Sequence, residues 1–208
     1  MGKFRELFTP RDMTEGTPWK RIVEFAIPML LGNIAQQFYN TADSIIVGKY
    51  IGDNALAAVG SAGPVLNLLM VLLIGISTGA GIMVAQYFGA KDREKLSRSI
   101  GVCITLTAIA SVFIMVVGPL IARPLLTLLN TPESIIDWCQ GYLTIFFIGI
   151  AGFNYYNILS GILRGLGDSV SALVFLLVST LLNVILDIWF VAGFKMGVPG
   201  VALATVIA

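Results

Sequence analysis

The chain consists of long apolar stretches separated by short polar segments. Five stretches with few or no charged residues are long enough to cross a bilayer as helices, which takes about 20 residues. They cover approximately Ile22–Gly48, Ala55–Ala90, Ser99–Ala122, Trp138–Leu163 and Ser169–Phe194. Glu24 and Asp43 interrupt the first stretch, and Asp187 interrupts the last. This pattern predicts an all-α fold, a polytopic bundle of membrane helices.

A sixth apolar run begins near Met196 and reaches Ala208. At about 13 residues it is too short to cross a bilayer. We therefore expect a fragment of a longer protein, with one lobe of about six transmembrane helices whose last helix is truncated. The expected organisation is an N-terminal tail over residues 1–21 and a transmembrane lobe over residues 22–208.

The distribution of Lys and Arg predicts the orientation of these helices. Ten of the 13 basic residues precede the first stretch or lie in alternate loops: Lys3, Arg5, Arg11, Lys20, Arg21, Lys91, Arg93, Lys95, Arg98 and Arg164. The opposite loops hold only Lys49, Arg123 and Lys195. Because positively charged loops stay on the cytoplasmic side, the tail is expected in the cytoplasm of a multi-pass cell-membrane protein.

Composition excludes several other classes of protein. The chain is 57% hydrophobic and 12% charged, whereas soluble domains carry roughly a quarter charged residues. A net charge of +1 without histidine provides no basic patch for nucleic acid. Cys103 and Cys139 lack the spacing of a metal site or a disulfide framework, so no structural metal or cofactor is expected.

Two carboxylates within the apolar stretches are candidate functional groups. A charge in the hydrocarbon core costs at least about 2.5 kcal/mol, so Asp43 and Asp187 need a reason to be there. Glu24 is close enough to Lys20 and Arg21 to reach the headgroups. With about 1.5 Å of rise per residue, Asp43 lies ~9 Å, Asp187 ~12 Å and Thr205 at most ~15 Å below the outer surface. The three groups are therefore expected in one layer.

Uncharged polar residues extend from these carboxylates along helix faces, at spacings of three and four residues. The stripes are Asn33, Gln36, Asn40 and Asp43; Ser179, Asn183 and Asp187; and Asn154, Asn157 and Gly161. Lipid cannot satisfy amides, so the stripes are expected to face one another or a water-filled cavity. For single amides the alternative is hydrogen bonding between helices, worth about 0.6 kcal/mol per bond.

Two aspartates that meet in a dry site favour binding of a proton or a cation. They cannot both ionise easily without a positive charge between them. A hard cation such as Na⁺ takes oxygen ligands, and Asp43, Asn183, Asp187 and Thr205 all carry oxygen atoms. We predict an ion site at these four residues, with Na⁺ or H⁺ left open.

Glycine and proline add two further expectations. Small residues recur four apart as Gly48/Gly52, Gly75/Gly79 and Gly161/Gly165, a spacing that lets membrane helices approach closely. Pro28 removes a backbone hydrogen bond in the first third of its helix. We interpret Pro28 as a hinge.

Several segments together resemble the N-terminal half of a multidrug and toxic-compound extrusion (MATE) transporter. They are PWKRIVEFAIPMLLGNIAQQFYNTADSIIVGKYIG, ALAAVG at 55–60, ILRGLGDS at 162–169 and NVILD at 183–187. The resemblance implies one of two six-helix lobes around a central cavity, which exports small, often cationic organic compounds against Na⁺ or H⁺. It also implies that the ion site includes Asp43, Asn183, Asp187 and Thr205, and that Pro28 is the bending proline.

The substrate cavity is expected to include Gln36, Asn40, Asn154 and Asn157, and the partner of this lobe is expected to be a C-terminal lobe of the same transporter. One alternative is a flippase of related fold for lipid-linked saccharides, which would carry basic residues in its cavity; the helix interiors contain none. Another is an accessory membrane subunit without transport of its own.

An enzyme is not expected, although Gly165-Leu166-Gly167-Asp168 matches the GxGD motif of intramembrane aspartyl proteases. Such an enzyme needs two aspartates at one depth, and Asp168 lies roughly 25 Å from Asp187 along the helix. A Gly-Asp turn beside Arg164 is the preferred interpretation.

Overall fold

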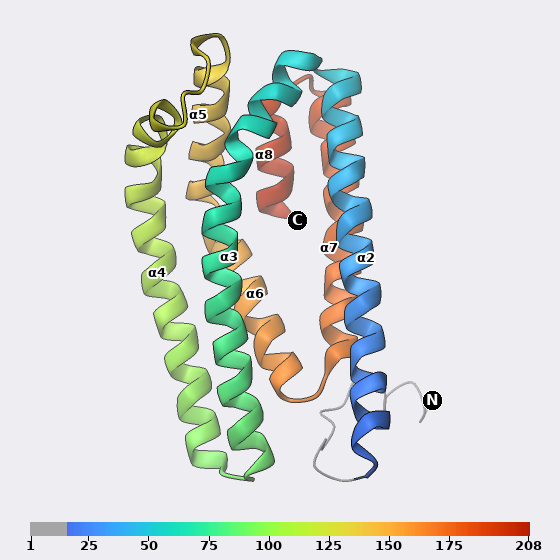
Figure 1. The fold of residues 1–208 in the computed structure, drawn as a ribbon. Coiled ribbons are helices and arrows are strands. Elements are labelled where there is room, and N and C mark those ends of the chain that lie inside the picture. Colours follow the sequence, from blue (N-terminus) through green and yellow to red (C-terminus); the bar gives the residue numbers. More distant parts are fainter. Residues whose placement is uncertain (1–15) are drawn as a thin grey trace.

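The computed structural model describes residues 16–208, and within this range it is a bundle of helices without strands (Figure 1). The three longest helices are α2 (Pro18–Tyr50), α3 (Asp53–Gly89) and α4 (Arg93–Leu128). Shorter helices follow: α5 (Glu133–Ile148), α6 (Ile150–Gly165), α7 (Ser169–Asp187), the π-helix η1 (Ile188–Gly193) and α8 (Val198–Ile207). The all-α fold is confirmed.

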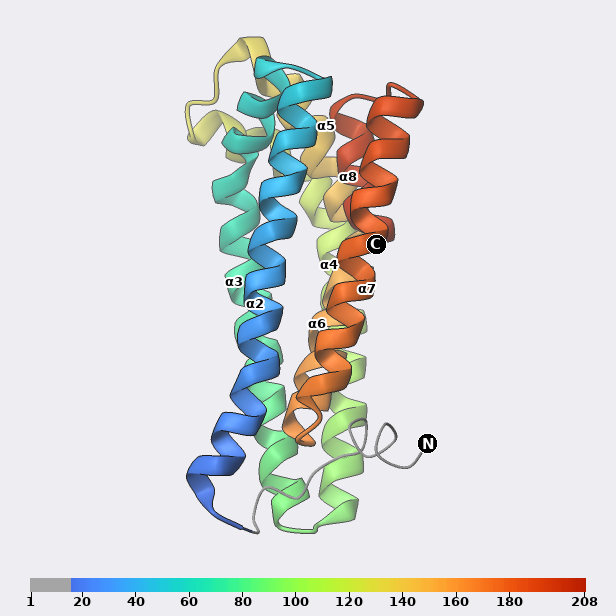
Figure 2. The same cartoon turned by 90° about the vertical axis from the view of Figure 1, so that its right-hand side faces the viewer.

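Successive helices run up and down, so alternate connections lie at the same end of the bundle (Figures 1 and 2). The start of α2, the α3–α4 turn and the α6–α7 turn share one end, called here the inner end. The positively charged segments of the described chain, which contain Lys20, Arg93 and Arg164, lie there. The tail residues Lys3, Arg5 and Arg11 are outside the described residues. The arrangement fits the predicted cytoplasmic orientation of this end.

The helices long and apolar enough to cross a membrane are α3, α4 and the combined α7–η1 segment. The pair α5 and α6 also qualifies as one span, bent by 52° at Gly149. The expectation of one continuous helix over Trp138–Leu163 was therefore wrong: the region forms two helices, which together make one bent span. α2 has 33 residues but is not among the apolar spans, because polar residues occur along much of its length.

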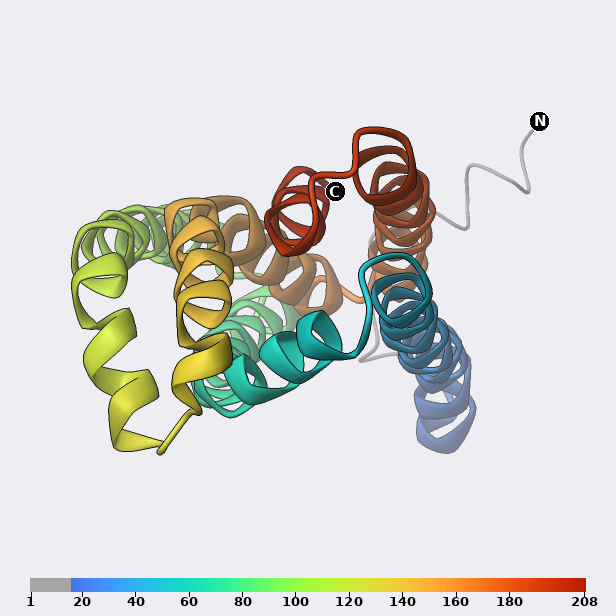
Figure 3. The same ribbon diagram turned by 90° about the horizontal axis from the view of Figure 1, so that it is seen from above.

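The bundle is divided into two packed groups (Figure 3). α2 and α7 pack mainly against each other, while α3, α4, α5 and α6 form the other group. The larger apolar core lies mainly in the second group, with Leu126 of α4 and Leu143 of α5, and it also takes in Val47 near the outer end of α2 and Val201 of α8. The weaker contact of the α2–α7 pair with the rest leaves room between the two groups.

Glycines bring α3 and α6 into close contact. A Cβ atom at Gly161 would lie 2.6 Å from the backbone oxygen of Ser77, and one at Gly81 would lie 2.8 Å from the oxygen of Gly161. Gly75 and Gly79 have no neighbour within 4 Å of such an atom, so that pair makes no helix contact in the described structure. The small-residue spacing thus marks an interface at Gly161 and Gly165, and the partner residues are Ser77 and Gly81.

Aspartate side chains cap the N-termini of two helices, α4 and α7. The Asp92 side chain accepts a hydrogen bond from the Lys95 backbone nitrogen at 3.1 Å, at the start of α4. This bond holds the pKa of Asp92 below its ordinary value, so the carboxylate stays ionised at neutral pH. Asp168 begins α7 in the same way, with bonds from the backbone nitrogen and hydroxyl of Ser171. The interpretation of Asp168 as part of a turn is confirmed.

The α3–α6 contact predicts different effects for two Gly→Ala substitutions. Gly161→Ala should lower the free energy of unfolding by about 1–3 kcal/mol, because the added methyl group meets the backbone of α3. Gly79→Ala is the matched control, since its methyl group would meet open space and alanine favours a helix. Thermal unfolding in detergent measures both, and equal melting temperatures would contradict the close contact.

Candidate functional site

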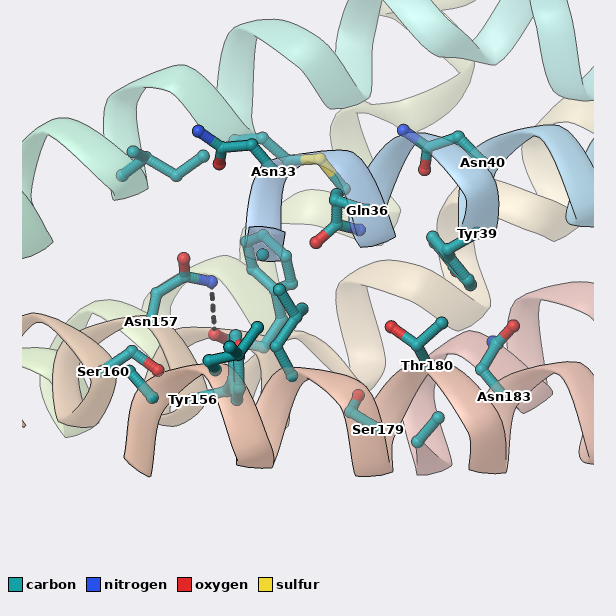
Figure 4. A pocket seen from close by; sticks show the side chains of 18 of the residues that line it. Asn33, Gln36, Tyr39, Asn40, Tyr156, Asn157, Ser160, Ser179, Thr180 and Asn183 are labelled. Carbon is teal, nitrogen blue, oxygen red and sulfur yellow. Dashed lines mark hydrogen bonds between the residues drawn. The ribbon is translucent and has the colours of Figure 1, made fainter. Parts of the chain in front are cut away.

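A cavity of about 490 Å³ lies between the α2–α7 pair and helices α5, α6 and α8. Polar residues from α2, α6 and α7 face one another across it (Figure 4). Those that line it are Asn33, Gln36, Tyr39, Asn40, Asp43, Tyr156, Asn157, Ser160, Arg164, Ser169, Ser179, Thr180 and Asn183. Polar residues of three helices thus meet across the cavity, as the spacing of the stripes predicted.

The α2 stripe lines the cavity over its whole length. Asn33, Gln36, Asn40 and Asp43 all contribute to the wall, and Tyr39 on the same helix joins them. They lie on one face because residues three and four apart are neighbours on a helix surface. Gln36 and Asn40 therefore line the cavity, and their role in substrate binding stays a prediction.

The most buried polar groups lie at the outer end of the cavity. Asp187 is fully buried, Asn183 is 2% exposed, and no described protein group forms a hydrogen bond with either side chain. Asp43 also has one unpartnered carboxylate oxygen, and it is close enough to Asp187 for the two to interact. Asp43 and Asn183 line the cavity, whereas Asp187 lies behind its wall.

Two tyrosines that the sequence reasoning missed complete this end. The Tyr39 hydroxyl lies 3.5 Å from the Thr205 hydroxyl, which joins α2 to α8. Tyr142 on α5 lines the cavity and, like Tyr39, interacts with both Asp43 and Asp187. The position of Tyr39, four residues before Asp43, could have indicated it. No feature of the sequence indicated that Tyr142 lies near the two aspartates, because its helix has no polar stripe.

The outer end therefore gathers oxygen atoms from Asp43, Asn183, Asp187 and Thr205, the four residues expected in one layer. Buried polar groups without partners are rare, because each costs free energy unless something binds it. Carboxylate, amide and hydroxyl oxygens are the donors that hard cations prefer, and a proton shared by the two carboxylates would also relieve their repulsion. The arrangement is suited to bind a small cation or a proton.

The local backbone changes at Asp187. The α-helix α7 ends at this residue and continues directly into the π-helix η1. Short π-helical turns are uncommon and occur frequently at functional sites. Beyond the junction the Trp189 ring stacks on Phe190, and both rings contact Phe194 at a tilt. This is the outer end of the bundle, and tryptophan favours the membrane interface.

The two asparagines of α6 have different environments. Asn157 lines the cavity, and its side chain donates a hydrogen bond to the backbone oxygen of Phe153 at 2.8 Å. Asn154 is 4% exposed, does not line the cavity, and donates to the hydroxyl of Ser111 on α4 at 2.9 Å. The structure therefore does not bring Asn154 to the substrate cavity; it links two helices instead.

The inner end of the cavity contains a basic residue, contrary to the expectation that none would be there. Arg164, in the last turn of α6, lines the cavity. From the sequence we expected Arg164 beside a Gly-Asp turn at the end of a helix. Its place in the cavity wall depends on how the helices pack. The argument against a flippase that rested on the absence of basic residues therefore fails.

Pro28 also lines the cavity, near its inner end. α2 continues through this proline without a break. A proline cannot donate the usual hydrogen bond to the residue four positions earlier, so the helix is locally weaker there. The position is suited to bending, which stays a prediction.

The apolar helices and the polar cavity between them define a multi-pass helical membrane protein. The chain belongs to the MatE family, whose profile matches residues 28–189. It is 34% identical over 208 residues to the "Probable multidrug resistance protein YoeA" of Bacillus subtilis (strain 168). The aligned region covers 98% of this chain and 45% of that protein. The chain thus spans about half the length of this relative and matches the N-terminal lobe.

Solved structures of MATE proteins share the fold. "Crystal structure of MATE in the bent conformation" is 31% identical, with a TM-score of 0.85 over 92% of this chain and 43% of that one. "Crystal structure of MATE in the straight conformation" is also 31% identical, with a TM-score of 0.86 over 92% of this chain and 42% of that one. The expected family and its single lobe are confirmed.

The environments of the two α6 asparagines predict separable effects. Asn154→Ala should lower the thermal stability of the protein by about 0.6–1.7 kcal/mol, because the bond to Ser111 is lost inside the membrane. Asn157→Ala should leave stability closer to wild type and change the affinity for compounds in the cavity. Thermal unfolding and ligand titration of both variants measure this, and the reverse pattern would contradict the assignment.

Proposed function

We propose that this lobe is the ion-coupled half of a transporter that exports small, often cationic organic compounds across the cell membrane by antiport with Na⁺ or H⁺. The observation that carries the proposal is the outer end of the cavity, where Asp43 and Asp187 interact and Asn183 has no partner. Family membership and the name of the relative in Bacillus subtilis support the transport of drugs.

The proposed ion site consists of Asp43, Asn183, Asp187 and Thr205, with Tyr39 and Tyr142 beside it. Two interacting carboxylates favour whichever state places a positive charge between them. Because Asp43 also lines the cavity, the charge state of the ion site bears directly on a cationic substrate there. Entry of the coupling ion and release of the cationic substrate are then linked, because both compete for the negative charge of Asp43.

The proposed conformational step involves the α2–α7 pair. This pair carries one side of the cavity and most of the ion site, and it packs less closely against the other helices. A ligand shifts such an equilibrium only by its different affinity for the two states. We propose that ion binding favours a bent form of α2 at Pro28, which changes the volume available to the substrate. Two of the similar MATE structures are described as bent and straight conformations.

A flippase for lipid-linked saccharides is the second candidate, since Arg164 lines the cavity. The two candidates differ in what the aspartates do: antiport needs them to change protonation or ion occupancy, while a headgroup-binding flippase does not. An accessory subunit predicts no transport effect of changes at either aspartate. An experiment on the two aspartates therefore separates antiport from the other two functions.

Asp43→Asn and Asp187→Asn should reduce ion-driven efflux of ethidium, a permanent cation, to the level of empty vesicles. The measurement uses the whole transporter that contains this lobe, reconstituted with an imposed Na⁺ or H⁺ gradient in separate arms. The reason is that an amide cannot exchange the positive charge that couples the two fluxes.

Asp53→Asn is the matched control, since Asp53 is exposed at the outer start of α3 and does not line the cavity. It should transport like wild type. Wild-type efflux in both cavity variants would remove the antiport proposal, and the gradient arm that drives ethidium identifies the coupling ion.

Pro28→Ala should slow exchange several-fold while membrane insertion is retained, because a continuous hydrogen-bonded helix resists bending. Pro64→Ala is the control, since Pro64 lies within α3 on an exposed face away from the cavity. Single-turnover ethidium efflux measures the rates. Equal rates for Pro28→Ala and wild type would refute the hinge.

A further inference from the structure

Opposite charges occupy the two ends of the cavity. Asp43 is the carboxylate and Arg164 the cation among the described residues that line it. Along α7, the 14 residues from Ser169 to Asn183 correspond to about 21 Å, so the two charges are far apart. One small substrate group cannot contact both, and the inner end has to be considered as a separate place for binding.

The guanidinium of Arg164 is held but not neutralised. Its Nε donates to the backbone oxygen of Ser160 at 3.1 Å, which fixes the side chain along α6. Within residues 16–208, no protein group accepts a hydrogen bond or forms an ion pair with its terminal amino groups. Arg164 is half-buried, and terminal amino groups without an acceptor lose hydration without full compensation, so the site favours an anion.

The nearest carboxylate in the sequence, Asp168, forms no ion pair with Arg164 and bonds to the start of α7 instead. One of its oxygens accepts a hydrogen bond from the backbone nitrogen of Ser171 at 2.9 Å, and the other accepts one from the Ser171 hydroxyl at 2.6 Å. Asp168 thus caps α7. The positive charge of Arg164 remains available to a molecule in the cavity.

The surroundings of Arg164 add hydrogen-bond donors and an apolar wall. Ser160 and Ser169 line the same end of the cavity, and the tight turn at Gly167, with a φ of +82°, brings the start of α7 next to the end of α6. Met29, Leu173 and Leu176 continue the lining toward the middle. A molecule that fits has an anionic head and an apolar body.

We propose that Arg164, with Ser160 and Ser169, forms an oxyanion subsite at the inner end of the cavity that binds the carboxylate or phosphate of an amphiphilic molecule. The proposal rests on the proposed transport function, and it extends the substrate class to compounds with an anionic group. The same chemistry is carried by an exported compound and by an anionic lipid headgroup. Arg164 lies in the last turn of α6, at the end of the bundle that faces the cytoplasm in the proposed orientation.

The test uses three probes with one fluorophore and different charges: dansylglycine, its methyl ester and dansylcadaverine. Binding is measured by fluorescence to the whole transporter in phosphatidylcholine nanodiscs. Wild type should bind dansylglycine more tightly than the uncharged ester. Arg164→Gln should weaken dansylglycine binding about tenfold or more and leave the ester and dansylcadaverine unchanged, while Arg164→Lys should retain part of the preference.

The matched control is Arg93→Gln, because Arg93 is exposed at the inner end of α4 and does not line the cavity. It should bind all three probes like wild type. Equal affinity of wild type for dansylglycine and its ester would overturn the proposal, and this result does not depend on how any variant folds. An effect of Arg93→Gln as large as that of Arg164→Gln would also overturn it.

A second arm identifies the source of the anion. Nanodiscs that contain phosphatidylglycerol should compete with dansylglycine if a lipid headgroup occupies the subsite; unchanged affinity assigns it to the exported compound. Ethidium efflux in vesicles of the same preparation separates the two proposals. Intact efflux with no preference for dansylglycine rejects only the anion subsite, whereas absent efflux with the preference retained rejects only cation export.

Discussion

The interaction between Asp43 and Asp187 is the constraint on which the rest of the lobe depends. Two acidic side chains in a membrane interior are tolerated only if a cation, a proton or other polar groups surround them. The structure places Asn183, Thr205 and two tyrosines around this pair and leaves several of their oxygen atoms without protein partners. A site of this kind has different stability when charged and when neutral, which is the property that ion coupling requires.

The helix packing separates this site from the rigid part of the bundle. Glycines hold α3 against α6 at backbone contact distance, and a large apolar core joins α3, α4, α5 and α8. The α2–α7 pair carries Asp43 and Asp187 and makes fewer contacts with that core. Charge in the ion site and the position of the pair are therefore physically connected, while the remaining helices serve as a frame.

The two ends of the cavity differ in the sign of their charge, in addition to the polar face along one side. Its outer end is acidic, and its inner end contains Arg164 with two serines. In such a cavity, cations would be attracted toward the proposed ion site and anions toward Arg164 at the inner end. The two ends would contribute to different steps, with recognition near the cytoplasm and ion-driven release near the outer surface.

The sequence by itself determined the membrane class, the topology and most of the outer site, because hydrocarbon forces charged and amide side chains into readable stripes. Asp43, Asn183, Asp187 and Thr205 were found this way, and so was the wall of Gln36 and Asn40. Only the tertiary structure decided that Asn154 bonds to α4, that the fourth span bends at Gly149, and that Tyr142 and Arg164 reach the cavity. These depend on how helices rotate and cross, which is set by close contacts between distant residues rather than by local periodicity.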